Sequence, residues 1–407
     1  MDRRGRLRHP GRDQRRHLRS QGVRVTVVIH SATKVDADDF LDDFWIAFTG
    51  PTIAATGTGN GWHGWATAPN AEVINAGGRR LSPGFIDMHS HGGGGHAFDD
   101  GAEAIEKAVA VHRAHGTTRS LLSLVANPIE KLCESLSTIA DLADADPLIL
   151  GSHLEGPFLA STQRGAHNPE YLLTPSPEIV DKLLSAGRGT IRQVTLAPEL
   201  PGAMEAIDRF VAAGVLVGVG HTDADFAVTK QAFDHGATLL THAFNAMPGI
   251  RHREPGPVTA ALGDPRVALE LILDGFHVHP EVARVAFFAA PMRILLITDA
   301  MAAAGSADGH YTLGDLSVSV TDGRALLSGT TTIAGSTLTQ DVALRSALID
   351  SEIDPVLAIR AVTASPARAL GLDDRLGYLA PGFAADVVLF DTEWNVSRVW
   401  AAGAPVV

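Results

Sequence analysis

The chain has 407 residues, 45% of them hydrophobic, and a formal net charge of −13. This length allows one large domain with a second small unit, and the composition is that of a soluble globular protein rather than a fibrous or disordered one. The negative charge argues against general nucleic-acid binding, and no apolar run is long enough to predict a membrane span. The single cysteine, Cys133, cannot form a disulfide within the chain, which fits a reducing cytoplasm.

The sequence predicts a disordered segment at the N-terminus and, after it, a small domain that strands from both ends of the chain form together. Residues 1–22, with eight arginines among the first 20 residues, are predicted to be a disordered extension or the result of a start codon placed too far upstream. A nucleic-acid-binding arm is the less favoured interpretation. Residues 23–82 contain short strands of alternating hydrophobicity, and similar strands recur at 304–334 and 373–407. We therefore predict that these three ranges form one small β-sandwich.

The region between these strands alternates apolar runs with helical segments. Continuous apolar runs rich in Val, Ile and Leu suit strands that are buried on both faces. Eight repeats within residues 83–303, completed by helical elements at about 335–372, predict a (β/α)₈ TIM-type barrel, with a doubly wound sheet as the alternative. The eight runs are GFIDMH, TRSLLSLV, PLILGSHLEG, IRQVTLAP, VLVGVGH, TLLTHAF, VALELILDG and RILLITDA.

Polar side chains interrupt these runs at their carboxyl ends. In a TIM barrel these ends face one another across the mouth, where active sites are built. With 18 histidines in the chain, about one HxH pair is expected by chance, but alternate residues on a strand share a face, so both histidines of PGFIDMHSH can point into the mouth. The residues are His89 and His91 after the first run, Glu155 after the third, His221 after the fifth, His242 after the sixth and Asp299 after the eighth.

These residue types indicate a metal centre. Glu155, His221 and His242 each end an apolar strand, where a carboxylate or imidazole is costly to bury unless it is paired or bound to metal. Two histidines and a carboxylate leave a position free for water, as catalytic zinc sites do. Asp299 is placed to act as the general acid and base. The alternatives are a salt-bridged glutamate, core histidines and, for Asp299, a helix N-cap.

The motifs PGFIDMHSHG, HLEGPF, GHTDA, THAFNAM, REPG, DGFHV, ITDAM and TIAGS, in this order, resemble the amidohydrolase superfamily. Within it they resemble the N-acetylglucosamine-6-phosphate deacetylase family, and the resemblance covers nearly the whole chain after Val23. It implies a divalent metal held by Glu155, His221 and His242, with a second one where His89 and His91 are both present. Zinc is the expected ion, and iron(II), manganese and cobalt suit the same ligands.

The resemblance also implies a substrate site that periodicity alone does not identify. The planar guanidinium of Arg253 suits a phosphate group, although a surface salt bridge is the alternative. His277 is implied to contact the phosphate or to polarise the acetyl carbonyl. The implied substrate-binding residues are Ala166, His167, Asn245, Ala246, Arg253, His277, Thr332, Ile333 and Ala334.

The function that the resemblance implies is metal-dependent hydrolysis of the acetamide of N-acetylglucosamine 6-phosphate, in amino-sugar catabolism and cell-wall recycling. A homodimer is expected, with the partner chain reaching toward the phosphate, and neither nucleic acid nor membrane is an expected partner. The alternatives are N-acetylgalactosamine 6-phosphate or a cyclic amide as the substrate. A barrel that has lost catalysis and serves as a scaffold is disfavoured because every candidate ligand and Asp299 are present.

Overall fold

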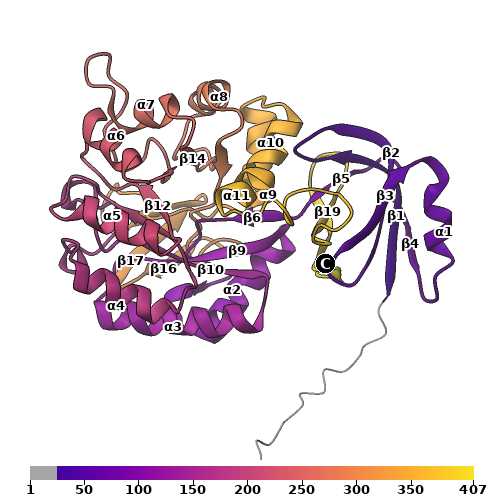
Figure 1. Ribbon diagram of the computed structural model, residues 1–407, viewed down its shortest axis with the longest axis horizontal. Coiled ribbons are helices and arrows are strands. Elements are labelled where there is room, and N and C mark those ends of the chain that lie inside the picture. Colours follow the sequence, from indigo (N-terminus) through magenta and orange to yellow (C-terminus); the bar gives the residue numbers. More distant parts are fainter. Residues whose placement is uncertain (1–24) are drawn as a thin grey trace, which may run out of the picture.

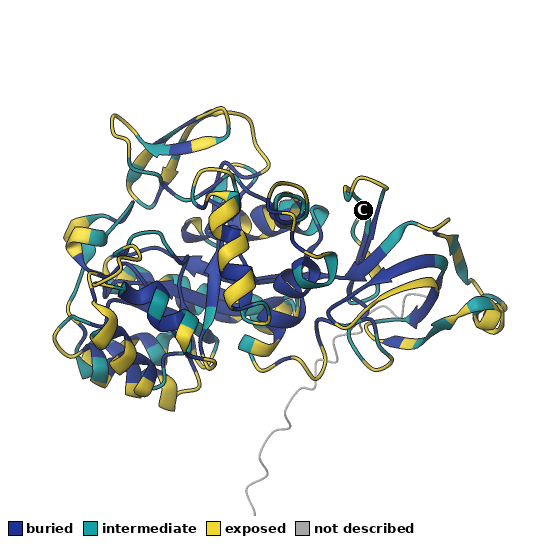
Figure 2. Cartoon of the chain, turned by 90° about the horizontal axis from the view of Figure 1, so that it is seen from above, coloured by how far each residue is buried: buried dark blue, intermediate teal, exposed yellow. Residues whose placement is uncertain are grey.

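The computed structural model describes residues 25–407, so the extension predicted for residues 1–22 lies outside the described part of the chain. Figure 1 shows a large unit in which helices surround a sheet and a small unit built mainly of strands. Figure 2 shows that the central strands are buried while the outer faces of the helices are exposed. Within residues 25–407, none of the helices is long and apolar enough to cross a membrane.

The large unit is the predicted (β/α)₈ barrel. Its eight strands pair in parallel, in the order β15-β14-β13-β12-β11-β10-β9-β6, and each lies within one of the eight apolar runs to within a residue. The prediction of a TIM-type barrel is therefore confirmed. The strands are β6 (Phe85–Asp87), β9 (Thr117–Leu124), β10 (Ile149–Glu155), β11 (Ile191–Leu196), β12 (Leu216–Val219), β13 (Leu239–Leu240), β14 (Ala268–Leu271) and β15 (Ile294–Leu296).

Helices follow the barrel strands and cover their outer faces. Several begin with a capping side chain: Ser176, for example, accepts a hydrogen bond from Ile179 N at the start of α4. The helices are α2 (Ala102–Ala114), α3 (Ile129–Ala145), α4 (Pro177–Gly187), α5 (Ala203–Ala212), α6 (Phe226–Asp234), α7 (Gly256–Gly263), α8 (Pro280–Ala289), α9 (Gln340–Arg345), η5 (Ser346–Asp350), α10 (Pro355–Val362) and α11 (Ala364–Ala369). Short turns of helix are η2 (Phe98–Asp100), η3 (Ser161–Gln163) and η4 (Pro169–Tyr171).

Side chains close the seam between the first and last barrel strands. Gln340 Nε2 donates to the main-chain oxygens of Ile86 and Leu296, at 3.0 and 3.1 Å. Nearer the carboxyl ends, Thr298 Oγ1 donates to Asp87 at 2.6 Å, and Asp299 N donates to the main-chain oxygen of His89 at 2.8 Å. The seam is thus stabilised in two places, by the Gln340 side chain of α9 and by hydrogen bonds beside the candidate site.

The small unit joins both ends of the described chain in one sheet, as expected from the sequence. The sheet has the order β21-β20-β19-β5-β1-β2-β3, with β4 paired to β1, and its core includes Ile29, Phe48 and Trp400. Its strands are β1 (Thr26–Val35), β2 (Phe40–Thr49), β3 (Ile53–Thr58), β4 (Glu72–Asn75), β5 (Arg80–Pro83), β19 (Val387–Phe390), β20 (Val396–Ala401) and β21 (Ala404–Pro405); η1 (Gly59–Trp62) and α1 (His63–Ala66) follow β3.

One group of strands lies elsewhere than the sequence grouping suggested. The strands β16 (Gly309–Leu313), β17 (Leu316–Thr321) and β18 (Arg324–Leu327) form a separate antiparallel sheet instead of pairing with the terminal strands. Figure 1 shows this sheet beside the barrel, far from the small unit. Its Leu313 and Val318 pack with Met301, so the sheet borders the end of β15. A two-stranded hairpin, β7 (Gly92–Gly93) and β8 (His96–Ala97), follows the HxH pair.

A buried ion pair connects the barrel to the small unit. On β9, Arg119 Nε lies 2.7 Å from Asp386 Oδ2, and Asp386 Oδ1 also accepts from Ala402 N at 2.6 Å. Removing one partner of a buried pair leaves an unpaired charge and costs about 3–5 kcal/mol. We expect Arg119→Met to lower the free energy of unfolding by about that amount, measured by urea denaturation. Lys182→Met, which breaks an exposed pair with Glu130, is the control and should shift the unfolding midpoint little.

Candidate metal centre and active site

A cavity of about 460 Å³ lies at the carboxyl ends of the barrel strands. Both carboxylates in its wall, Glu155 and Asp299, are candidate site residues, and His91, His221 and His242 line it with them. His89 is fully buried and does not line the cavity. Among the predicted substrate-binding residues, Ala166, His167, Asn245, Ala246, His277, Thr332 and Ile333 also line it.

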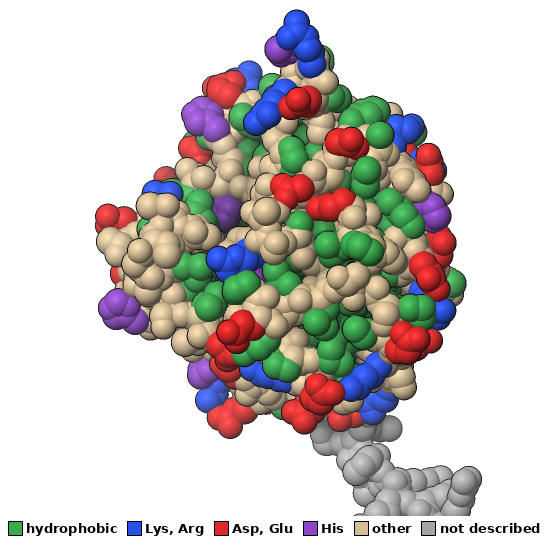
Figure 3. All heavy atoms as spheres, turned by 90° about the vertical axis from the view of Figure 1, so that its left-hand side faces the viewer, with side chains coloured by type: hydrophobic (Ala, Val, Ile, Leu, Met, Phe, Trp, Pro, Cys, Tyr) green, Lys and Arg blue, Asp and Glu red, His purple; other side chains and the backbone are tan. Residues whose placement is uncertain are grey.

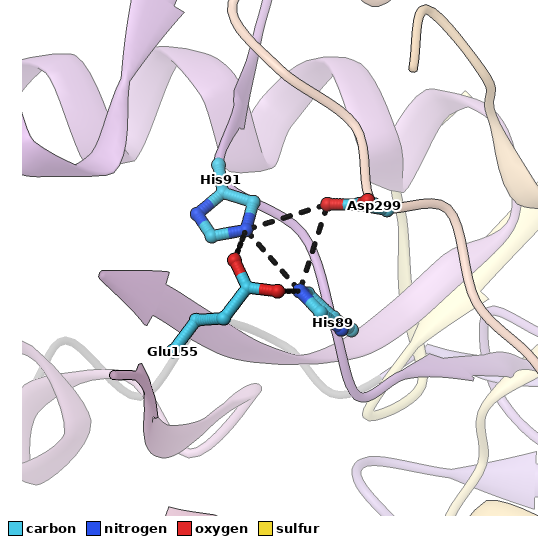
Figure 4. Close-up of side chains that lie close together, drawn as sticks. All are labelled: His89, His91, Glu155 and Asp299. Carbon is cyan, nitrogen blue, oxygen red and sulfur yellow. Dashed lines mark hydrogen bonds and ion pairs between the residues drawn. The ribbon is translucent and has the colours of Figure 1, made fainter. Parts of the chain in front are cut away.

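The first candidate metal position, shown in Figure 4, consists of the side chains of His89, His91, Glu155 and Asp299. His91 Nε2 lies 3.1 Å from Glu155 Oε2 and 3.4 Å from Asp299 Oδ1. His89 Nε2 lies 3.3 Å from Glu155 Oε1 and 3.5 Å from Asp299 Oδ1. The Nε2 atoms of the two histidines are 3.2 Å apart. The four donor atoms therefore converge on one buried point.

Glu155, His221 and His242 form the second candidate position. The Nε2 atoms of His221 and His242 are 3.0 Å apart, and each lies 3.1 Å from Glu155 Oε1. Ligand atoms about 2.1 Å from a tetrahedral zinc ion lie about 3.4 Å from one another, which is close to these separations. Since both groups contain Glu155, its carboxylate is placed to bridge two ions.

The outer ring nitrogens indicate where the protons are. His221 Nδ1 lies 2.7 Å from the main-chain oxygen of Gln163, and His89 Nδ1 lies 3.1 Å from Glu270 Oε2. Because oxygen acceptors face both Nδ1 atoms, each carries a hydrogen, so Nε2 is the nitrogen left to bind a metal once the ring is neutral. Both Nε2 atoms face Glu155 Oε1. A cation between these facing lone pairs stabilises them, so the residues present fit a metal ion.

The electrostatics of the first position also favour a cation. Burial lowers the pKa of His91, but its hydrogen bonds with Asp299 and Glu155 outweigh burial and raise that pKa to about 9. Burial raises the pKa of Asp299, but the charge of His89 and the hydrogen bond with His91 lower it to about 2. Asp299 is therefore an ionised carboxylate at neutral pH, able to accept a proton.

Three site residues adopt backbone conformations that non-glycine residues rarely adopt. His221, His242 and Asp299 have φ values of 48°, 28° and 48°, in or near the left-handed region. Such conformations cost of order 1–3 kcal/mol each and cluster at functional sites. Each of the three residues follows shortly after a barrel strand, β12, β13 or β15. The sharp change of direction turns each side chain into the barrel mouth.

Glu270 on β14 is a site residue that the sequence analysis did not identify. Its side chain is fully buried, and Oε2 accepts from His89 Nδ1 at 3.1 Å and from His242 N at 3.2 Å. Its Oε1 accepts from Gln193 Nε2 at 2.8 Å. One carboxylate thus holds a ligand from each candidate metal position. The available signal was an acidic residue in the middle of the apolar run VALELILDG.

We expect Glu270→Gln to weaken metal binding at the His89 position by about 10–100-fold, because outer partners of histidine ligands have effects of this size. Glutamine can keep every hydrogen bond, since Gln193 Oε1 has no partner among the described residues and can turn to accept the new amide. The variant therefore tests the charge alone. Metal content after dialysis against a graded chelator series is the measurement. Unchanged retention of both ions would contradict the prediction.

The predicted substrate-binding residues are not all in one place. His167 Nδ1 accepts from Ala126 N at 3.2 Å, so its Nε2 carries the hydrogen and faces Glu155 Oε2 at 3.3 Å. His277 Nδ1 contacts Asp274 at 2.7 Å; burial lowers the pKa of His277, but this carboxylate raises it above the ordinary value. Arg253 is exposed and lines a different cavity, and Ala334 is fully buried without lining either one.

Comparison with known proteins gives relatives over most of the chain. Residues 80–406 match the amidohydrolase family. The N-acetylgalactosamine-6-phosphate deacetylase of Escherichia coli O157:H7 is 40% identical over 328 residues, which cover 79% of this chain and 86% of that protein. The N-acetylglucosamine-6-phosphate deacetylase of Vibrio furnissii is 33% identical over 359 residues, which cover 86% of this chain and 89% of that protein.

Solved structures agree with this relationship. A variant N-acetyl-D-glucosamine-6-phosphate deacetylase from Mycobacterium smegmatis, in complex with N-acetyl-D-glucosamine-6-phosphate, has a TM-score of 0.88 and 41% identity, and the match covers 95% of this chain and all of that one. The Thermotoga maritima N-acetylglucosamine-6-phosphate deacetylase has a TM-score of 0.83 and 29% identity, with 93% and 99% covered. Because the family match spans well over half of the residues, the chain belongs to the amidohydrolase family.

Proposed function

We propose that the chain is a metal-dependent deacetylase that converts N-acetylglucosamine 6-phosphate to glucosamine 6-phosphate and acetate, in amino-sugar catabolism and cell-wall recycling. The observation that carries the proposal is one buried carboxylate, Glu155, shared by two groups of imidazole ligands at the base of a cavity that also contains Asp299. Relatives named as deacetylases of phosphorylated amino sugars support the substrate class. The location that the single cysteine favours, the cytoplasm, stays a prediction.

The proposed metal ligands are Glu155, His221 and His242 at one position and His89, His91 and Glu155 at the other. A divalent cation bound there supplies Lewis acidity toward the acetyl carbonyl and the attacking water. We propose zinc, which imidazole and carboxylate ligands suit; iron(II), manganese and cobalt suit them too. Metal content of the protein as purified identifies the ion.

Asp299 is the proposed catalytic acid and base. As an ionised carboxylate it takes a proton from the water that attacks the acetyl carbon. It then gives that proton to the amide nitrogen as the carbon–nitrogen bond breaks, so that glucosamine 6-phosphate leaves as an amine and the acetyl group leaves as acetate. His167 and His277, which line the same cavity, are proposed to hold the substrate. The other proposed substrate contacts are Ala166, Asn245, Ala246, Thr332, Ile333 and Ala334.

We propose a homodimer in which Arg253 of one chain enters the cavity of its partner. The support is its position: Arg253 is exposed and lies outside the cavity of its own chain. Mixing Asp299→Asn chains with Arg253→Ala chains tests this. If Arg253 acts across the dimer, a mixed dimer regains one complete site, and activity appears that neither variant has alone. No recovery in mixed dimers, verified by mass spectrometry, would overturn the assignment.

The direct experiment is acetate release by the purified protein in the presence of zinc. We expect release from N-acetylglucosamine 6-phosphate and little from the unphosphorylated sugar. N-acetylgalactosamine 6-phosphate is the second candidate substrate, favoured by the 40% identity to a relative of that name, and the ratio of kcat/KM for the two epimers decides between them. Dihydroorotate tests the cyclic-amide alternative. Absence of acetate release from both phosphorylated sugars would refute the proposal.

A further inference from the structure

A single arginine stands in the wall of the candidate active-site cavity. Among the described residues that line it, Arg164 is the only lysine or arginine, and it faces a wall that also contains the carboxylates Glu155 and Asp299. On the face of the molecule shown in Figure 3, basic and acidic side chains are interspersed. With a net charge of −13, the chain needs a local cation to hold an anionic substrate beside these carboxylates.

The Arg164 guanidinium is available for a ligand. Within residues 25–407 it makes no hydrogen bond or ion pair, whereas Arg119 and Arg209 both pair with carboxylates. Its side chain is half-buried, between the exposed Thr162 and the buried Ala166. A guanidinium has a planar set of donors that matches two oxygens of a phosphate. In the described cavity these donors have no protein acceptor to give up when an anion arrives.

The loop that carries Arg164 is fixed to the metal ligands on both sides. Before it, Gln163 accepts from His221 Nδ1 through its main-chain oxygen at 2.7 Å and donates from Nε2 to Asp223 at 2.6 Å. After it, Gly165 has a φ of 55°, and a Cβ there would lie 3.2 Å from the His221 ring. The Arg164 main-chain oxygen itself accepts from His167 N at 3.1 Å. The backbone is therefore held while the side chain is free.

We propose that Arg164 binds the phosphate group of the substrate from the same chain that supplies the metal ligands, and that it selects phosphorylated over unphosphorylated amino sugars. The inference rests on the proposed function for the identity of the substrate. Arg164, His167 and His277 line the cavity without a proposed metal role, and Arg164 is the one of the three that is charged at every relevant pH. Arg164 acts in binding and takes no part in the proton transfers of Asp299.

The test compares Arg164→Ala, Arg164→Lys and a control, Arg209→Ala, which removes a half-buried arginine on α5, outside the cavity. In zinc-loaded protein we expect Arg164→Ala to raise KM for N-acetylglucosamine 6-phosphate by about tenfold or more, as loss of charged hydrogen bonds does. The kcat should change little, and kcat/KM for unphosphorylated N-acetylglucosamine should not change. Lysine keeps the positive charge but lacks the planar guanidinium, so the KM of Arg164→Lys should lie between those of the wild type and Arg164→Ala. The control should match the wild type.

Two kinetic results would overturn the inference. One is an equal loss of kcat/KM on both sugars, which would mean that Arg164 supports the loop rather than the phosphate. The other is an unchanged KM for the phosphorylated sugar in a folded Arg164→Ala protein. Calorimetric titration with inorganic phosphate is read separately: wild-type affinity in Arg164→Ala overturns the inference even if the enzyme proves inactive. Absence of acetate release by the wild type would instead refute the proposed function.

Discussion

Replacing Asp299 by asparagine is expected to lower kcat for acetamide hydrolysis by about 10²–10⁴-fold, the contribution typical of a positioned acid–base group. Asparagine has nearly the same shape but cannot take up the proton of the attacking water or return one to the amine. The position of the residue at the seam is expected to persist, because Asp299 N donates to the main-chain oxygen of His89 whatever the side chain. The measurement is steady-state acetate release with zinc supplied.

The same experiment needs two checks on the protein. Metal content at the Glu155, His221 and His242 position should equal that of the wild type, because Asp299 is not part of that group. The exposed Asp350→Asn is the matched control for the chemical change and should keep full activity. A kcat within about threefold of the wild type for Asp299→Asn would show that another group transfers the proton.

Replacing Glu155 by glutamine should remove metal from both positions and reduce activity below detection. The carboxylate is the one ligand that the two groups share, so its loss affects both. A glutamine amide carries no charge and would turn an N–H donor toward His221 and His242 or toward His89 and His91, whose Nε2 atoms surround it within 3.3 Å. Elemental analysis of the purified variant is the measurement, with thermal unfolding to confirm that the barrel is folded.

A variant of a ligand that belongs to only one group shows whether the effect of Glu155→Gln comes from its place in both groups. His91→Asn should lose metal at the first position and retain it at the second, because His91 belongs to the first group alone. Glu103→Gln, on the exposed face of α2, is the matched control for Glu155→Gln and should retain metal at both positions. If Glu155→Gln retained as much metal as His91→Asn, the bridging role assigned to Glu155 would be wrong.

The barrel and its strand-end residues could be predicted because buried parallel strands have a simple signature. Most residues of such a strand are apolar, so Glu155, His221 and His242, each at or just beyond the end of an apolar run, stand out against their neighbours. The same signature fails for Glu270, which lies within its strand and whose partners, His89 and Gln193, come from two other strands. Contacts between distant strands are set by the closed barrel and leave no local pattern.

The positions of loops and surface strands were harder to predict from the sequence. The alternating strands at 309–327 have a period that fits any half-exposed sheet, so the sequence could not say that they would form their own sheet beside the barrel. Arg253 and Arg164 lie on irregular loops, and neither periodicity nor composition shows which arginine faces the cavity. The domain boundaries predicted from the sequence stay predictions.

The seam has a consequence for the order in which the protein becomes competent. His89 and His91 follow the first barrel strand and Asp299 follows the last, and they meet only where β6 and β15 are brought together by Thr298 and by Gln340 of α9. A nascent chain that has emerged only as far as residue 300 carries every metal ligand but lacks the helix that joins these strands. The first metal position is therefore expected to form only after synthesis has passed Gln340.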